Sequence, residues 1–153
     1  MKIRIETNQS LTEDEIIIRC QNKNEEIRQL QISIEELVVN TQCIPALQGK
    51  KEIYLSVSKI LFFETSDATI YAHTKDDMYE TSYKLYELED LLPGYFIRIS
   101  KSSIANIQQI LSINRNLTAS SIINFQDTYK QAYVSRHYFK LLKTRLEEKR
   151  LHL

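Results

Sequence analysis

The chain has 153 residues, of which 42% are hydrophobic and 26% are charged, and its 20 Lys and Arg residues balance its 20 Asp and Glu residues. This length suits one domain, or one domain with a small extension, and supplies enough apolar side chains for a real core. No apolar run approaches the ~18 to 20 residues of a membrane helix. The start, MKIRIETNQS, lacks the apolar core of a signal peptide, so we expect a cytoplasmic protein.

The N-terminal part shows two periodicities in turn. Residues 2–7 and 15–20 have the alternation and the β-branched content of strands. Residues 22–39 then change to a helical period, and Asn22 with Glu25 three residues later resembles a capping box. The apolar face of this predicted helix consists of Ile27, Leu30, Ile34, Leu37 and Val38.

The segment TQCIPALQGKK, with Pro45 and Gly49, marks a boundary. We therefore expect a small α+β extension, ββα in order, over residues 1–45 and a second domain over residues 46–153. The extension is expected to be regulatory or dimerising, and the apolar face of residues 27 to 38 could pack on the second domain, dimerise or dock a partner. The two cysteines, Cys20 and Cys43, lack the CxxC spacing and are expected to be free thiols.

The second domain is predicted to be mainly β, with short helices. A short helix should begin near Lys84 and end at Pro93-Gly94, and a closing helix should begin after Ser135 as its N-cap. Alternating and apolar runs predict the strands, with a polar turn KDD between the third and the fourth. They are expected at residues 52–57, 59–65, 68–74, 78–83, 96–100, 109–115, 121–126 and 129–134.

No arrangement of residues indicates an enzyme or a cofactor site. His73, His137 and His152 lie far apart in the sequence and outside metal-ligand spacings such as HExxH, and His73 is expected to be structural. The chain has only two glycines, too few for the glycine-rich loops that cradle phosphates. We therefore expect a protein without catalytic activity, metal or cofactor.

The charges are distributed unevenly along the chain. Residues 1–94 hold 10 Lys and Arg against 17 Asp and Glu, whereas residues 95–153 hold 10 against 3. This asymmetry favours an anionic partner for the C-terminal half, and it also fits simple attraction between the halves. Arg98, Lys101, Arg115 and Arg136 fall at the ends of predicted elements. Arg can pair with guanine and Lys with phosphate, so these ends could form a surface that reads duplex DNA.

Three segments, VSKILFFET, YKLYELEDLLPGYFIRISKSSIANIQQI and YVSRHYFKLLK, resemble the LytTR-type DNA-binding domain family over roughly residues 49 to 149. The resemblance implies a stack of small antiparallel β-sheets in a bacterial transcription regulator that works without a helix-turn-helix. It also implies binding to double-stranded DNA as a homodimer, with loop and strand-end residues in the major grooves of repeated half-sites. A small membrane protein is a further partner of such standalone members. The DNA-binding residues carried over or inferred from charge are Asp67, Ala68, Thr69, Arg98, Ser100, Lys101, Ser102, Arg115, Ser135 and Arg136.

The chain departs from the family pattern at several points. Ser100 stands where many members have His, and NFQDT replaces an Asn-Gly turn. The first ~48 residues are too few for a phosphate-accepting receiver domain. The alternative function is an interaction module whose basic half binds single-stranded RNA or an acidic protein. Exposed aromatic side chains would favour that alternative, and the candidates are Tyr129, Tyr133, Tyr138 and Phe139.

Overall fold

The computed structural model describes residues 2–12, 14–40 and 42–150. It divides into two compact units, residues 1–35 and 36–153. The helix α1 (Glu25–Asn40) begins in the first unit. Its N-cap is Asn24 rather than the predicted Asn22, because Asn24 Oδ1 accepts a hydrogen bond of 3.0 Å from the backbone N–H of Ile27. An asparagine at this position satisfies one of the free amides of the first turn.

The described residues that precede α1 contain no strand, so the two strands predicted at 2–7 and 15–20 are wrong. Residues 2–7 alternate and residues 15–20 are rich in β-branched side chains, but a strand also needs a neighbour to accept its backbone hydrogen bonds. Ile3 and Ile5 are 93% and 87% exposed. No described residue before β1 whose burial is known is buried. The helical part of the extension is therefore present, and its β part is not.

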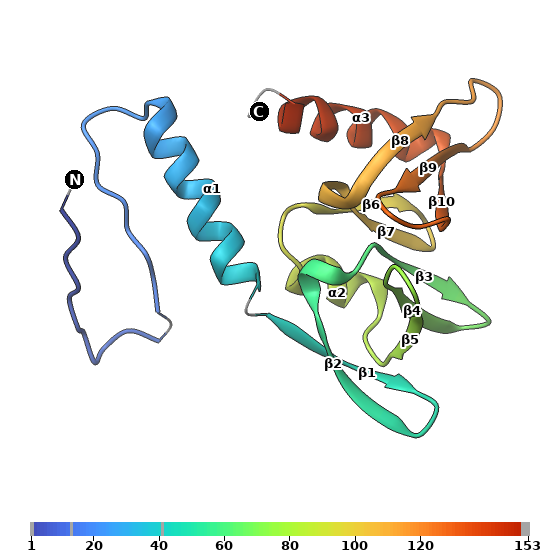
Figure 1. Cartoon of the computed structure of the whole chain (residues 1–153), viewed down its shortest axis with the longest axis horizontal. Helices are drawn as coiled ribbons and strands as arrows, with labels where there is room; N and C mark the ends of the chain where they lie inside the picture. Colours follow the sequence, from blue (N-terminus) through green and yellow to red (C-terminus); the bar gives the residue numbers. More distant parts are fainter. Residues whose placement is uncertain (1, 13, 41, 151–153) are drawn as a thin grey trace. The chain divides into compact units, whose positions relative to one another are not determined.

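The second unit consists of two antiparallel sheets and two further helices (Figure 1). The larger sheet has seven strands in the order β2-β1-β5-β4-β3-β7-β6, and the smaller has three in the order β10-β9-β8. The strands are β1 (Cys43–Gln48), β2 (Lys51–Ser56), β3 (Phe62–Ser66), β4 (Thr69–His73), β5 (Met78–Thr81), β6 (Phe96–Ser100), β7 (Ser103–Asn106), β8 (Ile110–Asn114), β9 (Ser121–Phe125) and β10 (Gln131–Val134). The helices are α2 (Leu85–Leu91) and α3 (Arg136–Arg150).

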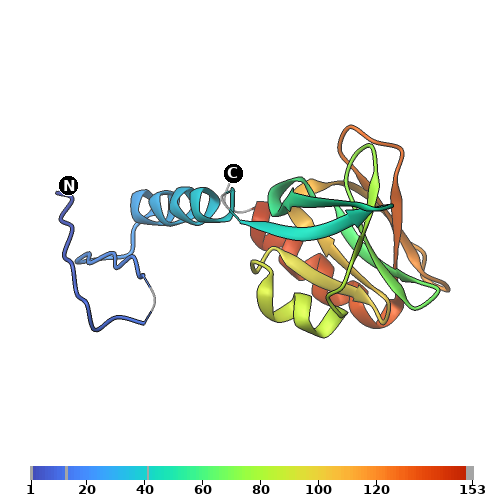
Figure 2. The ribbon, with the colours of Figure 1, turned by 90° about the horizontal axis from the view of Figure 1, so that it is seen from below.

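The predicted boundary between residues 45 and 46 falls inside β1. This strand pairs with β2 along its whole length, and the two form a long hairpin (Figures 1 and 2). Its one partner residue in β5 is Glu80, opposite Leu47. Pro45 therefore lies where β1 is an edge, the place in a sheet that tolerates a residue without an N–H. Because a proline is rare inside a strand, the sequence pattern did not predict β1.

The strand β7 also went unpredicted, because its sequence SIAN does not alternate. All four of its residues are buried, since it lies between β3 and β6. Asn106 is fully buried and donates a hydrogen bond of 2.9 Å from Nδ2 to the carbonyl of Ile60. A buried amide needs such a partner, so the polar letters of this strand describe a satisfied core position and not a loop.

Two hydrophobic clusters hold the second unit together, and β3 contributes to both. Phe63 belongs to the cluster beneath α2, with Leu88 of that helix. Phe62 belongs to the cluster between the two sheets and α3, with Phe125 and Leu142. Successive side chains of a strand point to opposite faces, so the pair of phenylalanines in FFET joins the two cores. This packing fixes the ends of the strands that carry the candidate site.

Candidate nucleic-acid interface

Three of the segments predicted to contact DNA meet at one end of the second unit. They are the β3–β4 turn, the β6–β7 turn and the junction between β10 and α3. Two backbone hydrogen bonds join them: Thr65 N–H donates to the carbonyl of Ser102 at 2.8 Å, and Ser135 N–H donates to the carbonyl of Ile99 at 2.9 Å. The sequence positions of these segments are far apart, so the sheet topology brings them together.

Arg98 organises the β6–β7 turn from within. Its Nε donates a hydrogen bond of 2.7 Å to the carbonyl of Ser100, and one terminal nitrogen donates to the carbonyl of Lys101. The other terminal nitrogen lies 3.4 Å from Glu89 Oε1 of α2. The side chain is 20% exposed. The guanidinium thus directs its donors to its own chain, at a point where the ladder between β6 and β7 has a bulge.

The turn held by Arg98 presents two hydroxyls and one ammonium group. Ser102 N–H donates a hydrogen bond of 3.2 Å to Ser100 Oγ, and the two hydroxyl oxygens lie 3.3 Å apart. Lys101 is exposed at the tip. Ser100 has no ring donor, but its hydroxyl is fixed beside that of Ser102. Hydroxyl and ammonium groups are the donors that proteins direct at phosphate oxygens.

Ser135 is the residue before α3, as predicted. Its carbonyl accepts hydrogen bonds from the N–H groups of Tyr138 at 3.1 Å and Phe139 at 3.0 Å. Its hydroxyl oxygen is buried and has no hydrogen-bond partner among the described residues, so the predicted side-chain cap is not made. Arg136 is the first residue of α3 and is exposed. The helix start therefore places one unpaired hydroxyl and one exposed guanidinium side by side.

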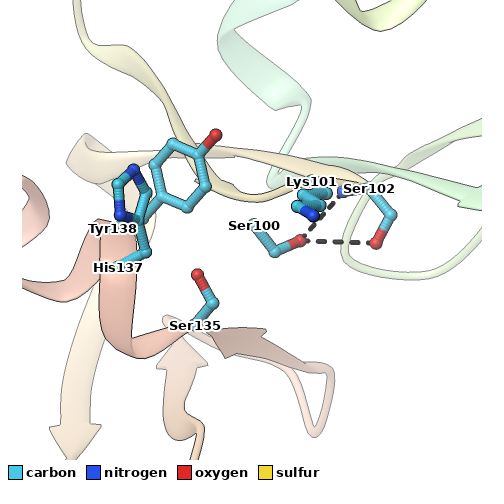
Figure 3. A pocket seen from close by; sticks show the side chains of 6 residues that line it. All are labelled: Ser100, Lys101, Ser102, Ser135, His137 and Tyr138. Atoms are coloured by element: carbon cyan, nitrogen blue, oxygen red, sulfur yellow. Dashed lines mark hydrogen bonds between the residues drawn. The ribbon is translucent and has the colours of Figure 1, made fainter.

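The β6–β7 turn and the start of α3, without Arg136, line a surface hollow of about 520 Å³ (Figure 3). Figure 3 shows the β6–β7 turn on one side of it and the start of α3 on the other. The lining residues are Ser100, Lys101, Ser102, Ser135, His137 and Tyr138. His137 and Tyr138 are not among the residues predicted to bind DNA. Their position directly after Ser135 and Arg136 is the signal that could have added them.

The β3–β4 turn lies on the neighbouring hairpin. Ser66 pairs with Thr69, so Asp67 and Ala68 form a two-residue turn, with φ values of 49° and 63°. A type I′ turn requires positive φ at both positions and is usually built with Asn or Gly. Neither residue here is glycine, so the backbone at Ala68 is strained. These residues are outside the hollow, although the hydrogen bond between Thr65 and Ser102 places their hairpin next to it.

Arg115 follows β8 at the same end of the smaller sheet, because Asn114 pairs with Ile122 and Ser121 pairs with Val134. Its guanidinium carbon lies 5.0 Å from the centre of the Phe139 ring. A cation above an aromatic face is attracted to it. This contact anchors Arg115 to α3, outside the hollow.

The aromatic side chains that would favour single-strand binding fall into two groups. Tyr129 and Tyr133 are 104% and 63% exposed, whereas Tyr138 and Phe139 are half-buried. Two of the four candidate rings are therefore available to a base.

The β9–β10 loop replaces the Asn-Gly turn of the family pattern. Asp127 of this loop has a φ of 57° and so takes the left-handed conformation that a glycine would adopt in such a turn.

The described residues contain no group of three His, Cys, Asp or Glu side chains that could hold a metal ion. His73 is buried against Phe62, with ring centres 4.3 Å apart, and its Nε2 lies 2.8 Å from Glu64 Oε1. Burial lowers the pKa of His73, and the Glu64 carboxylate partly opposes that shift. His137 is exposed, and His152 lies outside the described residues. None of the helices in the described part of the chain could cross a membrane.

Comparison with known proteins gives the domain a family. The family model for the LytTr DNA-binding domain matches residues 50–147. A Staphylococcus aureus NCTC 8325 protein named as an uncharacterized HTH-type transcriptional regulator is 30% identical over 150 residues, covering 95% of this chain and 98% of its own. The corresponding proteins of strains COL and N315 match equally well. The name of these relatives refers to a helix-turn-helix. In the described residues of this chain, however, five strands separate each α-helix from the next.

A solved structure shows the same fold. It is the LytTr DNA-binding domain of a putative methyl-accepting/DNA response regulator from Bacillus cereus, with a TM-score of 0.64 and 23% identity. The match covers 69% of this chain and 97% of that one. The stack of antiparallel sheets with short helices, predicted from the sequence, is therefore confirmed. Because the family model matches residues 50–147, the chain belongs to the LytTR family and carries a LytTr DNA-binding domain.

Proposed function

We propose that this protein is a transcriptional regulator that reads the major groove of double-stranded DNA with the end of its second unit. The observation that carries the proposal is the meeting of the β3–β4 turn, the β6–β7 turn and the start of α3 around one hydroxyl-rich, cationic surface. The staphylococcal relatives are named as transcriptional regulators, which supports the same role.

The geometry suggests different roles for the cations. Arg136 is exposed at the first position of α3, where its backbone is fixed, so it is the base reader in our proposal. Lys101 and the hydroxyls of Ser100 and Ser102 contact phosphate oxygens, while Ser135 sets the helix start, whose free amides point to the same surface. Arg98 has its donors occupied, so it positions the β6–β7 turn and does not reach the DNA.

The remaining predicted residues lie around the hollow. Asp67, Ala68 and Thr69 reach an adjacent part of the groove, where the Asp67 carboxylate accepts from a cytosine amino group. Arg115, held over Phe139, contacts the phosphate backbone beside α3. Two copies of the domain occupy repeated half-sites in the cytoplasm. The N-terminal unit makes no DNA contact and has a regulatory role, with a small membrane protein as its partner.

The test is selection of bound duplexes from a random pool with the full chain, followed by salt titration of the selected duplex. We expect two spaced half-sites, and a slope of the logarithm of affinity against the logarithm of salt near −4 to −5 from ~4 to 6 phosphate contacts per domain. Equal affinity for selected and scrambled duplexes would refute the proposal.

A second candidate, binding of single-stranded RNA, is favoured by one observation, the exposure of Tyr129 and Tyr133. Aromatic rings that stack on bases contribute ~1 to 3 kcal/mol each. Replacing both tyrosines by alanine should leave duplex affinity unchanged if the major-groove proposal holds. Loss of binding to single strands, with single strands preferred over every duplex, would support the second candidate instead.

A further inference from the structure

The helix α1 carries a heptad seam that the DNA-binding site does not use. Ile27 and Ile34 are seven residues apart, and Leu30 and Leu37 follow each of them by three. In heptad letters the isoleucines occupy position a and the leucines position d. Val38, at position e, borders this seam. The combination of a β-branched residue at a with leucine at d favours two parallel strands.

The charges of α1, except that of Glu26, lie away from this seam. With Ile27 at a, Glu25 falls at f, Arg28 and Glu35 at b, and Glu36 at c. The flanking e positions hold Gln31 and Val38, and Glu26 at g is opposite the Gln31 of a parallel second helix. Interhelical e and g positions decide which partners a coiled coil accepts, and here no carboxylate would meet another. The charge pattern of α1 is therefore compatible with an identical partner.

None of the four seam residues is fully buried. Leu37 is 67% exposed, and Ile27, Leu30 and Ile34 are half-buried. The N-terminal extension, residues 1–45, is too short to bury enough apolar surface to be stable alone. A helix of 16 residues is also marginal in water without tertiary contacts. Both conditions call for a partner surface that repeats with the same period.

We propose that α1 of one chain pairs with α1 of a second copy as a parallel, in-register, two-stranded coiled coil. The pairing stands independently of the DNA contacts, and it specifies how two copies are held together before they meet DNA. Two heptads form a short interface, so we expect a dissociation constant in roughly the micromolar range. The coiled coil would make binding to a second half-site intramolecular and so raise its effective concentration.

The test compares two substitutions of the same kind in the full-length chain by sedimentation equilibrium. Ile34→Lys places an ammonium group at position a, whereas Ile32→Lys places it at position f, on the same helix and at another half-buried isoleucine. We expect Ile34→Lys to raise the dissociation constant of the dimer by about a hundredfold or more, because the charge would be desolvated in the seam. Ile32→Lys should change it by no more than a few fold. A monomeric wild-type chain, or equal effects of the two variants, would overturn the proposal.

A cross-linking experiment reports the orientation even if Ile34→Lys disturbs the helix. In a chain whose Cys20 and Cys43 are replaced by serine, Leu30→Cys should form a disulfide-linked dimer under mild oxidation, because identical d positions face each other in a parallel pair. Ile32→Cys at position f should not. If Leu30→Cys links only to a chain carrying Ile34→Cys, the helices are antiparallel and the proposal fails.

Affinity for a single half-site separates this inference from the proposed function. The Ile34→Lys chain should bind an isolated half-site as the wild-type chain does, and should lose only its advantage on two half-sites. A dimer that persists while no duplex is preferred would refute the DNA-binding proposal and leave the coiled coil intact.

Discussion

The two units of the chain differ in what their apolar side chains contact. In the second unit Phe63, Ile104 and Leu88 are fully buried between a sheet and a helix. In the first unit Ile3, Ile5 and Ile16 are 93%, 87% and 65% exposed. The difference teaches that a regular apolar period sets which side chains share a face, whereas burial depends on a second surface with a matching period. None of the described residues of the first unit whose burial is known is buried.

The largest expected effect comes from removing one apolar side chain from each unit. Phe63→Ala deletes a fully buried side chain and should lower the free energy of unfolding by ~3 to 5 kcal/mol, because a cavity remains in the core. Ile5→Ala should change it by less than about 0.5 kcal/mol, since Ile5 is exposed. Urea denaturation of both variants measures the difference. A cost above 2 kcal/mol for Ile5→Ala would show that the first unit has a core that the structure lacks.

The same contrast explains which parts of the fold could be predicted. The strand ranges from 52–57 onward, α2 and the start of α3 agree with the structure, because their periodic residues have partners in the same chain. Segment 2–7 alternates and segment 15–20 is rich in β-branched residues, but neither pairs with a strand among the described residues, and a local pattern does not reveal whether a partner exists. β1 went unpredicted because it contains Pro45, and β7 because its sequence SIAN does not alternate. The sheet topology places Pro45 at an edge and lets the buried Asn106 amide donate a hydrogen bond to Ile60.

For the candidate site, the chain segments could be predicted but the roles of individual side chains could not. Ser100, Lys101 and Ser135 lie together as the predicted segments required. Arg98 and Lys101 were both predicted to contact DNA. In the structure, however, the donors of Arg98 are directed at Ser100, Lys101 and Glu89. The direction of a side chain depends on partners such as Glu89, which a strand pattern does not reveal.

DNA binding extends the comparison to the cations of the two units. Arg136→Ala should weaken binding to the selected duplex by ~1 to 3 kcal/mol and relax the preference at one base pair. Arg19→Ala, which removes an exposed cation of the first unit, should have no effect. Lys101→Ala should weaken all duplexes about equally and reduce the salt slope by ~1. Fluorescence anisotropy on matched and single-substitution duplexes measures all three. Exchanged phenotypes for Arg136 and Lys101 would reverse our role assignments.

The dependence of stability on pH also tests the comparison, because the second unit contains a buried histidine, His73. Burial lowers the pKa of His73, while the Glu64 carboxylate raises it and the Lys130 ammonium lowers it further. Protonation would also leave a second N–H at the buried Nδ1, which has no hydrogen-bond partner among the described residues. Below the ordinary pKa of ~6.5 the unfolded chain therefore binds more protons than the folded one, and stability falls as pH drops through that value.

The variant His73→Phe should remove this part of the pH dependence, because it keeps a ring against Phe62 and eliminates the titrating group. Thermal unfolding between about pH 5 and pH 8 measures it. Replacement of His137, which is exposed, is the control and should leave the profile unchanged. An unaltered profile for His73→Phe would show that other groups account for the acid sensitivity.

The smallest expected effect concerns the strained turn beside the candidate interface. Ala68 has a φ of 63°, a conformation that costs a residue with a Cβ roughly 1 to 2 kcal/mol and costs glycine almost nothing. Ala68→Gly should therefore raise the free energy of unfolding by ~0.5 to 1 kcal/mol after the entropy of the more flexible unfolded chain is subtracted. Ala119→Gly, in an exposed loop without positive φ, should lower it slightly. If the strain holds Asp67 in its DNA-binding position, Ala68→Gly should also weaken duplex binding as it stabilises the fold, and these opposite signs would separate the functional cost of this turn from the stability of the unit that carries it.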